Sequence, residues 1–350
     1  MRKCSVCGAP VKLGRDLEWL DYGVIRQRKY TEHHMVFYES DNIDGLFFEI
    51  ERLIGLPLEH IVIESKRKDT REYVEKMFPA WIRRRLRRSG MNLMVNQMRR
   101  VGSIFGYGKS SLQDKRIKGD PEDYITIRIE NPHSVLLFAG ECLGAWEALQ
   151  ERDSKVEYRK VAENTYDFTC RIGEHPLELK ERLLHKEYRH RPVDFSWERC
   201  PKCDIPMEVS RYEWDLENGI ITSMETGRRM SVMRPDGIDS ILDDLESELG
   251  EDVPRLVIDA QRIYTRKELG ASEFRKNVDS FRWMLAFRGL GYLSEMDVSE
   301  AGLHIEIKNF CMPLMMVGII QAFYELNMDI EETSYSWKVS DDALSIDITG

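Results

Sequence analysis

Cys4-Ser5-Val6-Cys7-Gly8 at the start of the chain and Cys200-Pro201-Lys202-Cys203-Asp204 past its middle are two Cys-x-x-Cys segments of one design. The offset of 196 residues between them also places Gly23 on Gly219. After a one-residue gap near residues 31–41, Asp44, Glu51 and Gly55 fall on Asp239, Glu246 and Gly250. A repeat of this length indicates two similar domains, because solenoid periods are far shorter.

A second matching stretch lies near the end of each copy. At an offset of 178 residues, Ile127, Ile129, Asn131, Gly140 and Glu147 meet Ile305, Ile307, Asn309, Gly318 and Glu325. The length of 350 residues also suggests about two domains. We therefore expect a first repeat over residues 1–175, a linker over 176–197 and a second repeat over 198–350.

Composition narrows the class of protein. Hydrophobic residues make up 42% and charged residues 32% of the chain, as in globular proteins. No apolar run reaches the roughly 18 residues of a membrane span, and the start lacks a secretory signal, so we expect a cytoplasmic protein. Seven cysteines, an odd count with two tight pairs, argue against a secreted disulfide framework. The net charge of −10 argues against a whole-surface nucleic-acid binder.

Each copy predicts the same series of elements. A hairpin around Asn218-Gly219 follows the second Cys-x-x-Cys segment. Helices ending at Gly55 and Gly250 come next, then strand candidates at residues 60–64 and 255–259, then a second amphipathic helix. Each copy closes with a strand, a helix and a strand: 125–131, 134–149 and 166–172 in the first, 303–309, 313–326 and 344–348 in the second. The fold class predicted is α+β with mostly antiparallel sheet.

The cysteine pairs predict a metal site. Two thiolates two residues apart can aim at one tetrahedral ion, but a closed zinc site needs four ligands and neither half has a second pair. We therefore predict that Cys4, Cys7, Cys200 and Cys203 share one structural zinc, which clamps the two copies about a pseudo-twofold axis. The alternatives are two independent reduced pairs or vestigial ones. A redox dithiol is disfavoured, since neither pair opens a helix after a strand.

A basic segment is confined to the first copy. It spans residues 82–100 and includes Arg83, Arg84, Arg87 and Arg88. Such a helix can bind phosphates of an anionic partner. The structural alternative, which we favour, is a solvated face that pairs with carboxylates of this acidic chain. No catalytic constellation stands out in the sequence.

The last third of each copy resembles the 4-vinyl reductase domain family, whose fold is related to that of Golgi transport (TRAPP) subunits. The resemblance rests on a strand ending in Asn131 or Asn309, a helix with an internal glycine and a late aromatic-Glu pair (Trp146-Glu147, Tyr324-Glu325), and a final alternating strand. Many family members bind zinc through a cysteine pair near the final strands. Lys160, Tyr166, Tyr335 and Ala343 stand about there, so that site is not carried over.

The resemblance implies a protein that binds or senses a hydrophobic or aromatic molecule, as a monomeric pseudo-dimer or a homodimer. A pocket is expected between the last helix and the sheet of each copy, lined by Leu136, Leu137, Gly140, Leu143, Leu314, Met315, Gly318 and Ile319. One alternative is an enzyme or accessory protein that acts on a tetrapyrrole or an aromatic compound. Another is a nucleic-acid-associated regulator that uses the basic helix 82–100.

Overall fold

The computed structural model describes residues 1–175, 188–269, 278–340 and 342–350, and it mixes helices with antiparallel sheets. A six-stranded sheet with the order β1-β2-β3-β10-β9-β8 takes three strands from each half. Its strands are β1 (Leu17–Leu20), β2 (Val24–Gln27), β3 (His34–Glu39), β8 (Tyr212–Asp215), β9 (Ile220–Ser223) and β10 (Arg229–Met233). The halves join at its centre, where β3 pairs antiparallel with β10.

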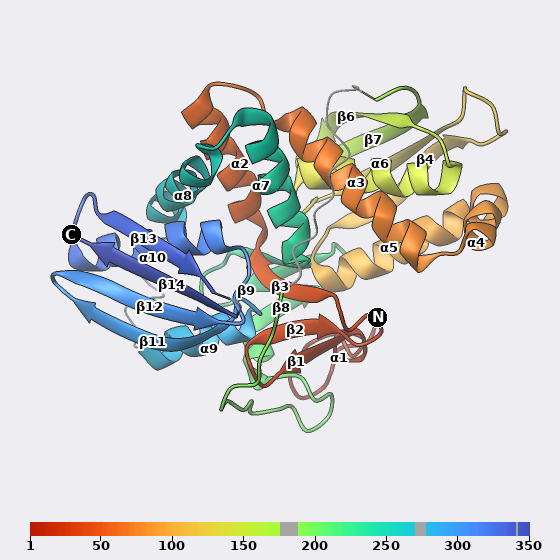
Figure 1. Ribbon diagram of the computed structural model, residues 1–350. Helices are drawn as coiled ribbons and strands as arrows, with labels where there is room; N and C mark the ends of the chain where they lie inside the picture. Colours follow the sequence, from red (N-terminus) through yellow and green to blue (C-terminus); the bar gives the residue numbers. More distant parts are fainter. Residues whose placement is uncertain (176–187, 270–277, 341) are drawn as a thin grey trace.

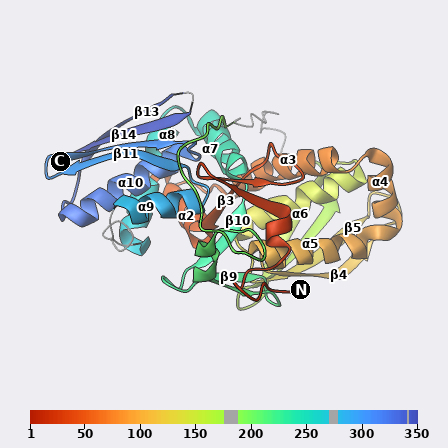
Figure 2. The ribbon, with the colours of Figure 1, turned by 90° about the horizontal axis from the view of Figure 1, so that it is seen from below.

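Two four-stranded sheets lie at opposite ends of the molecule, with the hairpins of the six-stranded sheet between them (Figures 1 and 2). Their strand orders correspond: β4-β5-β7-β6 in the first half and β11-β12-β14-β13 in the second. The strands are β4 (Lys109–Arg116), β5 (Tyr124–Glu130), β6 (Ser154–Ala162), β7 (Thr165–Ile172), β11 (Tyr292–Ser299), β12 (Gly302–Lys308), β13 (Ser334–Val339) and β14 (Ala343–Thr349).

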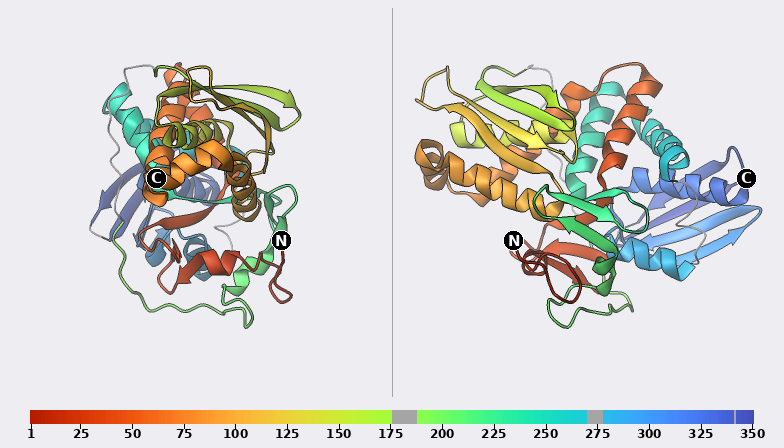
Figure 3. Two further views of the ribbon diagram at one scale, coloured as in Figure 1. Left: turned by 90° about the vertical axis from the view of Figure 1, so that its right-hand side faces the viewer. Right: turned by 180° about the vertical axis from the view of Figure 1, so that it is seen from behind.

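Helices fill the space between and beside the end sheets, as the view from behind shows most clearly (Figure 3). Helix α6 covers the first sheet with α5 beside it, and α10 covers the second. The helices and helical turns of the first half are α1 (Leu13–Asp16), α2 (Ser40–Ile54), α3 (Glu59–Met77), α4 (Ala80–Arg85), the π-helical turn η1 (Leu86–Gly90), α5 (Met91–Phe105) and α6 (Val135–Gln150). Those of the second half are η2 (Met207–Arg211), α7 (Pro235–Leu249), α8 (Val253–Tyr264), η3 (Thr265–Leu269), α9 (Val278–Phe287) and α10 (Pro313–Met328).

The strands expected at residues 60–64 and 255–259 are wrong: both segments are helical, in α3 and α8. Short apolar runs do not distinguish a buried strand from a buried helix. In α8 the buried positions Val257, Ile258, Gln261 and Tyr264 recur at helical spacing, and this stripe packs the helix onto its neighbours.

The late aromatic-Glu pair of each half has a structural role. Glu147 and Glu325 are both fully buried. Glu147 accepts a hydrogen bond from Arg67 on α3 at 2.9 Å, and Glu325 accepts one from Arg262 on α8 at 2.8 Å. Each carboxylate therefore ties the last turn of its own helix, α6 or α10, to the neighbouring helix, with its buried charge paired.

Each hairpin packs against the opposite half. Trp19 on β1 donates from its indole nitrogen to the Phe287 carbonyl at 2.8 Å, and Trp214 on β8 donates to the Ile104 carbonyl at 3.0 Å. Backbone hydrogen bonds join Gly291 to Gly23 and Gly108 to Gly219. A side chain at Gly23 would place its Cβ 2.5 Å from the Gly291 oxygen, so only glycine permits this approach.

The linker residues 176–187, and part of the helix expected before Gly289, lie outside the described residues. Within the described chain, each helix is too short or too polar to cross a membrane.

Candidate functional site

The structure brings the four cysteines of the two Cys-x-x-Cys segments together. Their sulfur atoms all lie within 4.8 Å of one another, so the cluster could hold a metal ion. Cys4 Sγ lies 3.8 Å from Cys200 Sγ, and Cys7 Sγ lies 3.4 Å from Cys203 Sγ. Sulfurs placed about 2.3 Å from a tetrahedral zinc are about 3.8 Å apart, so this spacing fits such an ion.

Matching local turns shape the two segments. The amide of Gly8 donates to the Cys4 carbonyl, and the amide of Asp204 donates to the Cys200 carbonyl. Gly8 and Asp204 both have positive φ, 77° and 59°, which closes each turn on its sulfurs. Across the cluster, Lys202 Nζ donates to Ser5 Oγ at 2.6 Å.

A core of aromatic side chains lies under the cysteine cluster. Cys4, Cys7 and Cys200 are buried and belong to one hydrophobic cluster with Trp19, Trp214, Phe37, Phe105 and Phe287. This core takes residues from both halves. A metal held by the cysteines would therefore fasten the hairpins that each half places on the other.

A cavity of about 310 Å³ lies in the first half, bounded by α3, α5, α6 and the first end sheet. Most of its wall is apolar and includes Val74, Met77, Phe78, Met94, Met98, Phe105, Phe138 and Ala145. The second half contributes Met233, Arg234 and Ile238, from the end of β10 and the start of α7. Both halves thus form the cavity wall.

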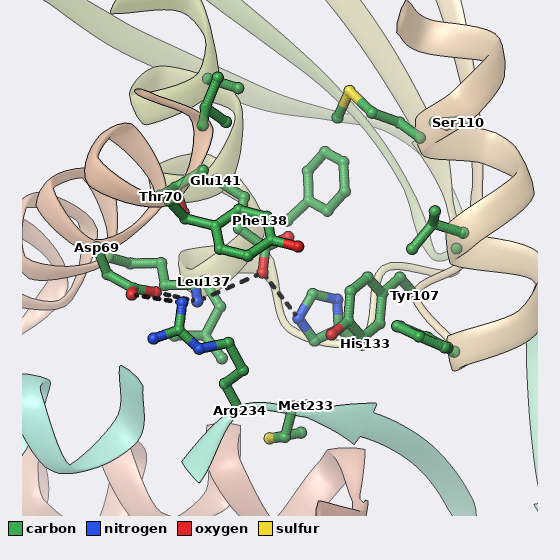
Figure 4. Close-up of a pocket in the computed structure, with 18 of the residues that line it drawn as sticks. Asp69, Thr70, Tyr107, Ser110, His133, Leu137, Phe138, Glu141, Met233 and Arg234 are labelled. Atoms are coloured by element: carbon green, nitrogen blue, oxygen red, sulfur yellow. Dashed lines mark hydrogen bonds and ion pairs between the residues drawn. The ribbon is translucent and has the colours of Figure 1, made fainter. Parts of the chain in front are cut away.

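Charged side chains gather at one end of this cavity (Figure 4). Lys66 Nζ donates to Asp69 Oδ2 at 2.8 Å, and Arg234 lies 3.4 Å from Asp69 Oδ1. Arg234 also pairs with Asp236 and lies over the ring of Tyr73, 5.5 Å from its centroid. The two cations therefore have close partners.

Glu141 projects into the cavity from α6 and is less closely paired. Its Oε1 atom lies 3.8 Å from Lys66 Nζ and 3.7 Å from His133 Nε2. Burial raises the pKa of Glu141 to about 7, against the opposing effect of Lys66. Burial also holds the pKa of His133 well below its usual value, so this imidazole is neutral.

His133 is fixed by stacking. Its ring lies 4.3 Å from that of Tyr107, whose hydroxyl donates to the Val232 carbonyl at 2.6 Å. The imidazole is only 4% exposed, and its Nδ1 atom has no hydrogen-bond partner among the described residues. A buried group of this kind is a position at which a ligand can complete a hydrogen bond.

A second hollow, of about 540 Å³, adjoins the charged end. It shares Tyr73, Met77 and Arg234 with the cavity. Tyr30, Glu32 and Lys76 are among its other lining residues. The shared residues mark the side from which a molecule would reach Glu141.

Of the residues predicted to line a pocket in the first half, Leu137 lines the cavity. Leu143 is buried in the core beneath it, and Leu136 packs between two hydrophobic clusters. Gly140 faces α3 instead, since a Cβ there would lie 2.7 Å from the Ile63 carbonyl oxygen. This glycine lets two helices approach closely and does not line the cavity, although it was predicted as a lining residue.

In the part of the second half that the structure describes, side chains fill the corresponding region. Gly318 faces α8, where a Cβ would lie 2.5 Å from the Ile258 carbonyl oxygen. Met315 is fully buried in the core and Leu314 packs against it. Ile319 borders a space of only about 20 Å³, together with Phe281, Met316 and Phe323.

Sequence positions explain the difference between the halves. At the offset of 178, Ala145 corresponds to Phe323 and Glu141 to Ile319. Counting from Gly106 and Gly289, Gly102 corresponds to Leu285. Larger apolar side chains thus stand in the second half where the first half leaves room.

Two arginines of the basic segment donate hydrogen bonds to carbonyl groups at the ends of helices. Arg83 donates to the Phe78 carbonyl at 3.0 Å, and Arg87 donates to the Gln150 carbonyl at 3.2 Å, so both satisfy the last carbonyls of neighbouring helices. Arg84 is 62% exposed and lies 3.9 Å from Glu151. The side chain of Arg88 lies outside the described residues. These contacts favour the structural interpretation of this segment.

No protein-family model and no curated protein matches this chain. Solved structures similar to part of it include a mutant of the H-NOX protein of T. tengcongensis, at 18% identity over 33% of this chain and 74% of that one, with a TM-score of 0.24. An oxygen-binding H-NOX domain related to soluble guanylate cyclases, in its oxygen complex, gives 18% identity, 33% and 72% coverage and the same TM-score of 0.24. At that TM-score the likeness carries no argument about this protein.

Proposed function

We propose that this protein binds a small, mainly apolar molecule in the cavity of its first half. The observation that carries the proposal is a cavity of about 310 Å³ with an apolar wall and charged groups gathered at one end. Ligand sites have this character, an apolar lining with a few polar groups that orient the ligand, and volumes from roughly 300 Å³ upward. Such a volume favours a compound of one ring over a tetrapyrrole.

In this proposal the first half holds the ligand and the second half completes the wall of the cavity. Among the described residues of the second half, the corresponding space beside Ile319 is about 20 Å³, which is too small for a ligand of this kind. The second half supplies Met233, Arg234 and Ile238 to the wall of the first cavity. The second half therefore serves as a scaffold for the site.

We further propose that the two halves form a pseudo-twofold intramolecular dimer, held by one zinc on Cys4, Cys7, Cys200 and Cys203. The symmetric strand order of the six-stranded sheet supports the arrangement. Four thiolates at tetrahedral spacing support zinc, because soft sulfur ligands in this geometry select it or an iron–sulfur centre. Four protein ligands leave no position open, so the role is structural.

Kinship with the 4-vinyl reductase domain family remains part of the proposal. It is carried by the sequence pattern that ends in Trp146-Glu147 and Tyr324-Glu325. The structure gives that pattern a folding role through the buried glutamates. A ligand-binding role is what the resemblance adds.

One observation favours catalysis as a second candidate function. Glu141, with its pKa near 7, and neutral His133 face one cavity, and perturbed groups in a cleft are typical of acid–base sites. A binding protein would return its ligand unchanged. An enzyme would yield a product that depends on Glu141.

Fluorobenzene followed by ¹⁹F NMR tests the binding proposal. The wild-type protein should broaden and shift the fluorine signal in a saturable way. Ala145→Phe, which copies the second half at Phe323, should abolish this effect. Ala301→Phe adds the same ring at an exposed turn and should bind as the wild type does. Equal binding by all three proteins would show that the cavity is not the site.

A further inference from the structure

We infer that the molecule held in this cavity carries one positively charged nitrogen, a protonated amine on an apolar body, which reaches Glu141. The inference rests on the proposed function and names its class of ligand. Its basis is the way in which the charged groups at this end of the cavity pair with one another.

Among the described residues, two carboxylates, Asp69 and Glu141, and two cations, Lys66 and Arg234, line this cavity. Lys66 Nζ forms an ion pair with Asp69 Oδ2 at 2.8 Å, and Arg234 forms ion pairs with both Asp69 and Asp236. Glu141 is the less closely paired of the two lining carboxylates, since its Oε1 atom lies 3.8 Å from Lys66 Nζ.

Two further polar atoms of the cavity wall can accept a hydrogen bond from a ligand. The Nε2 atom of neutral His133 is directed at Glu141, at 3.7 Å. If Nε2 carries the proton, Nδ1 is an acceptor, and it has no partner among the described residues. Ser110 Oγ also lines the cavity, is buried and lacks a described partner. An ammonium group has three donors and no acceptor, which suits this set.

Aromatic rings form part of the wall of the same cavity. Tyr73, Tyr107, Phe78, Phe105 and Phe138 all line the cavity. Rings of this kind attract a cation that lies over them, more strongly where water is excluded. An anionic ligand would instead lie beside the carboxylate of Glu141 and would have to separate Lys66 or Arg234 from Asp69.

Three molecules of nearly equal shape test the inference by calorimetry: 2-phenylethylamine, 2-phenylethanol and phenylacetate. The wild type should bind the amine at least about tenfold more tightly than the alcohol, because hydrogen bonds between charged groups are stronger than neutral ones. Phenylacetate should bind most weakly. Glu141→Gln should remove the preference by weakening the amine about tenfold while the alcohol is unchanged.

Glu130→Gln provides the matched control. Glu130 lies on β5 of the same half, outside the cavity lining, and pairs with Lys109 at 3.7 Å. It should keep the preference for the amine. Equal binding of all three molecules, or tightest binding of phenylacetate, would overturn the inference and leave the cavity a binding site. Absence of binding by all three at millimolar concentration would overturn the proposed function with it.

Discussion

Replacing Glu141 with glutamine should stabilise the ligand-free protein in a pH-dependent way. The pKa of Glu141 is raised from 4.5 to about 7 by burial. The folded state therefore keeps its proton to higher pH than the unfolded state, and this carboxyl costs stability as pH rises through that window. At 1.36 kcal/mol per pKa unit, the full cost above about pH 7 is on the order of 3 kcal/mol.

Glutamine resembles the protonated acid and does not ionise. Glu141→Gln should therefore have little effect near pH 4.5 and should raise the free energy of unfolding by up to about 3 kcal/mol near pH 8. Urea denaturation at both pH values measures the difference between the wild type, Glu141→Gln and the half-buried control Glu130→Gln, which lies outside the cavity lining. An equal increase in the free energy of unfolding at both pH values, or a decrease near pH 8, would refute the reasoning that burial disfavours the ionised form of Glu141.

Three further changes have defined outcomes. Ala145→Phe should raise the free energy of unfolding by about 1 kcal/mol in a thermal melt, because it buries a ring in existing space at some packing strain; a marked loss would mean that the space is not available. Glu325→Gln should cost about 3–5 kcal/mol in urea denaturation, because it leaves Arg262 and Arg266 without their buried carboxylate; a cost below about 1 kcal/mol would contradict that role. Cys203→Ser should lose bound metal to a chelator far sooner than the wild type, whereas Cys311→Ser, which changes a buried thiol outside the cluster, should not.

The elements nearest the core follow from the sequence. Alternation of Ile125, Ile127 and Ile129 predicted a strand that the structure has as β5 (Tyr124–Glu130). Gly55 and Gly250 were expected to end helices, and α2 and α7 stop there. The Asn218-Gly219 hairpin is present as β8 and β9. In each case the local signal agrees with the burial pattern.

The outer strands of the end sheets escaped prediction. β6 (Ser154–Ala162) and β13 (Ser334–Val339) are mostly exposed, and the apolar alternation in each is short: Val156 and Tyr158 in β6, and Tyr335, Trp337 and Val339 in β13. Each is held by its partner, β7 or β14, rather than by burial of its own side chains. Such strands depend on tertiary pairing, which sequence pattern does not report.

The cysteine cluster could be predicted from the sequence, whereas the cavity could not. Spacing alone pointed to Cys4, Cys7, Cys200 and Cys203. The charged end of the cavity draws on α3, the segment before α6, α6 itself and the start of α7, which no local motif connects. One signal was present: Glu141 is the charged residue in the apolar run from Val135 to Trp146.

X-ray absorption at the zinc edge of the purified protein, with the metal counted per chain, tests the central claim most directly. We expect one zinc per chain with four sulfur neighbours at about 2.3 Å. A first shell containing nitrogen or oxygen, two zinc ions per chain, or a stable fold without metal would contradict a single clamp made of thiolates from both halves.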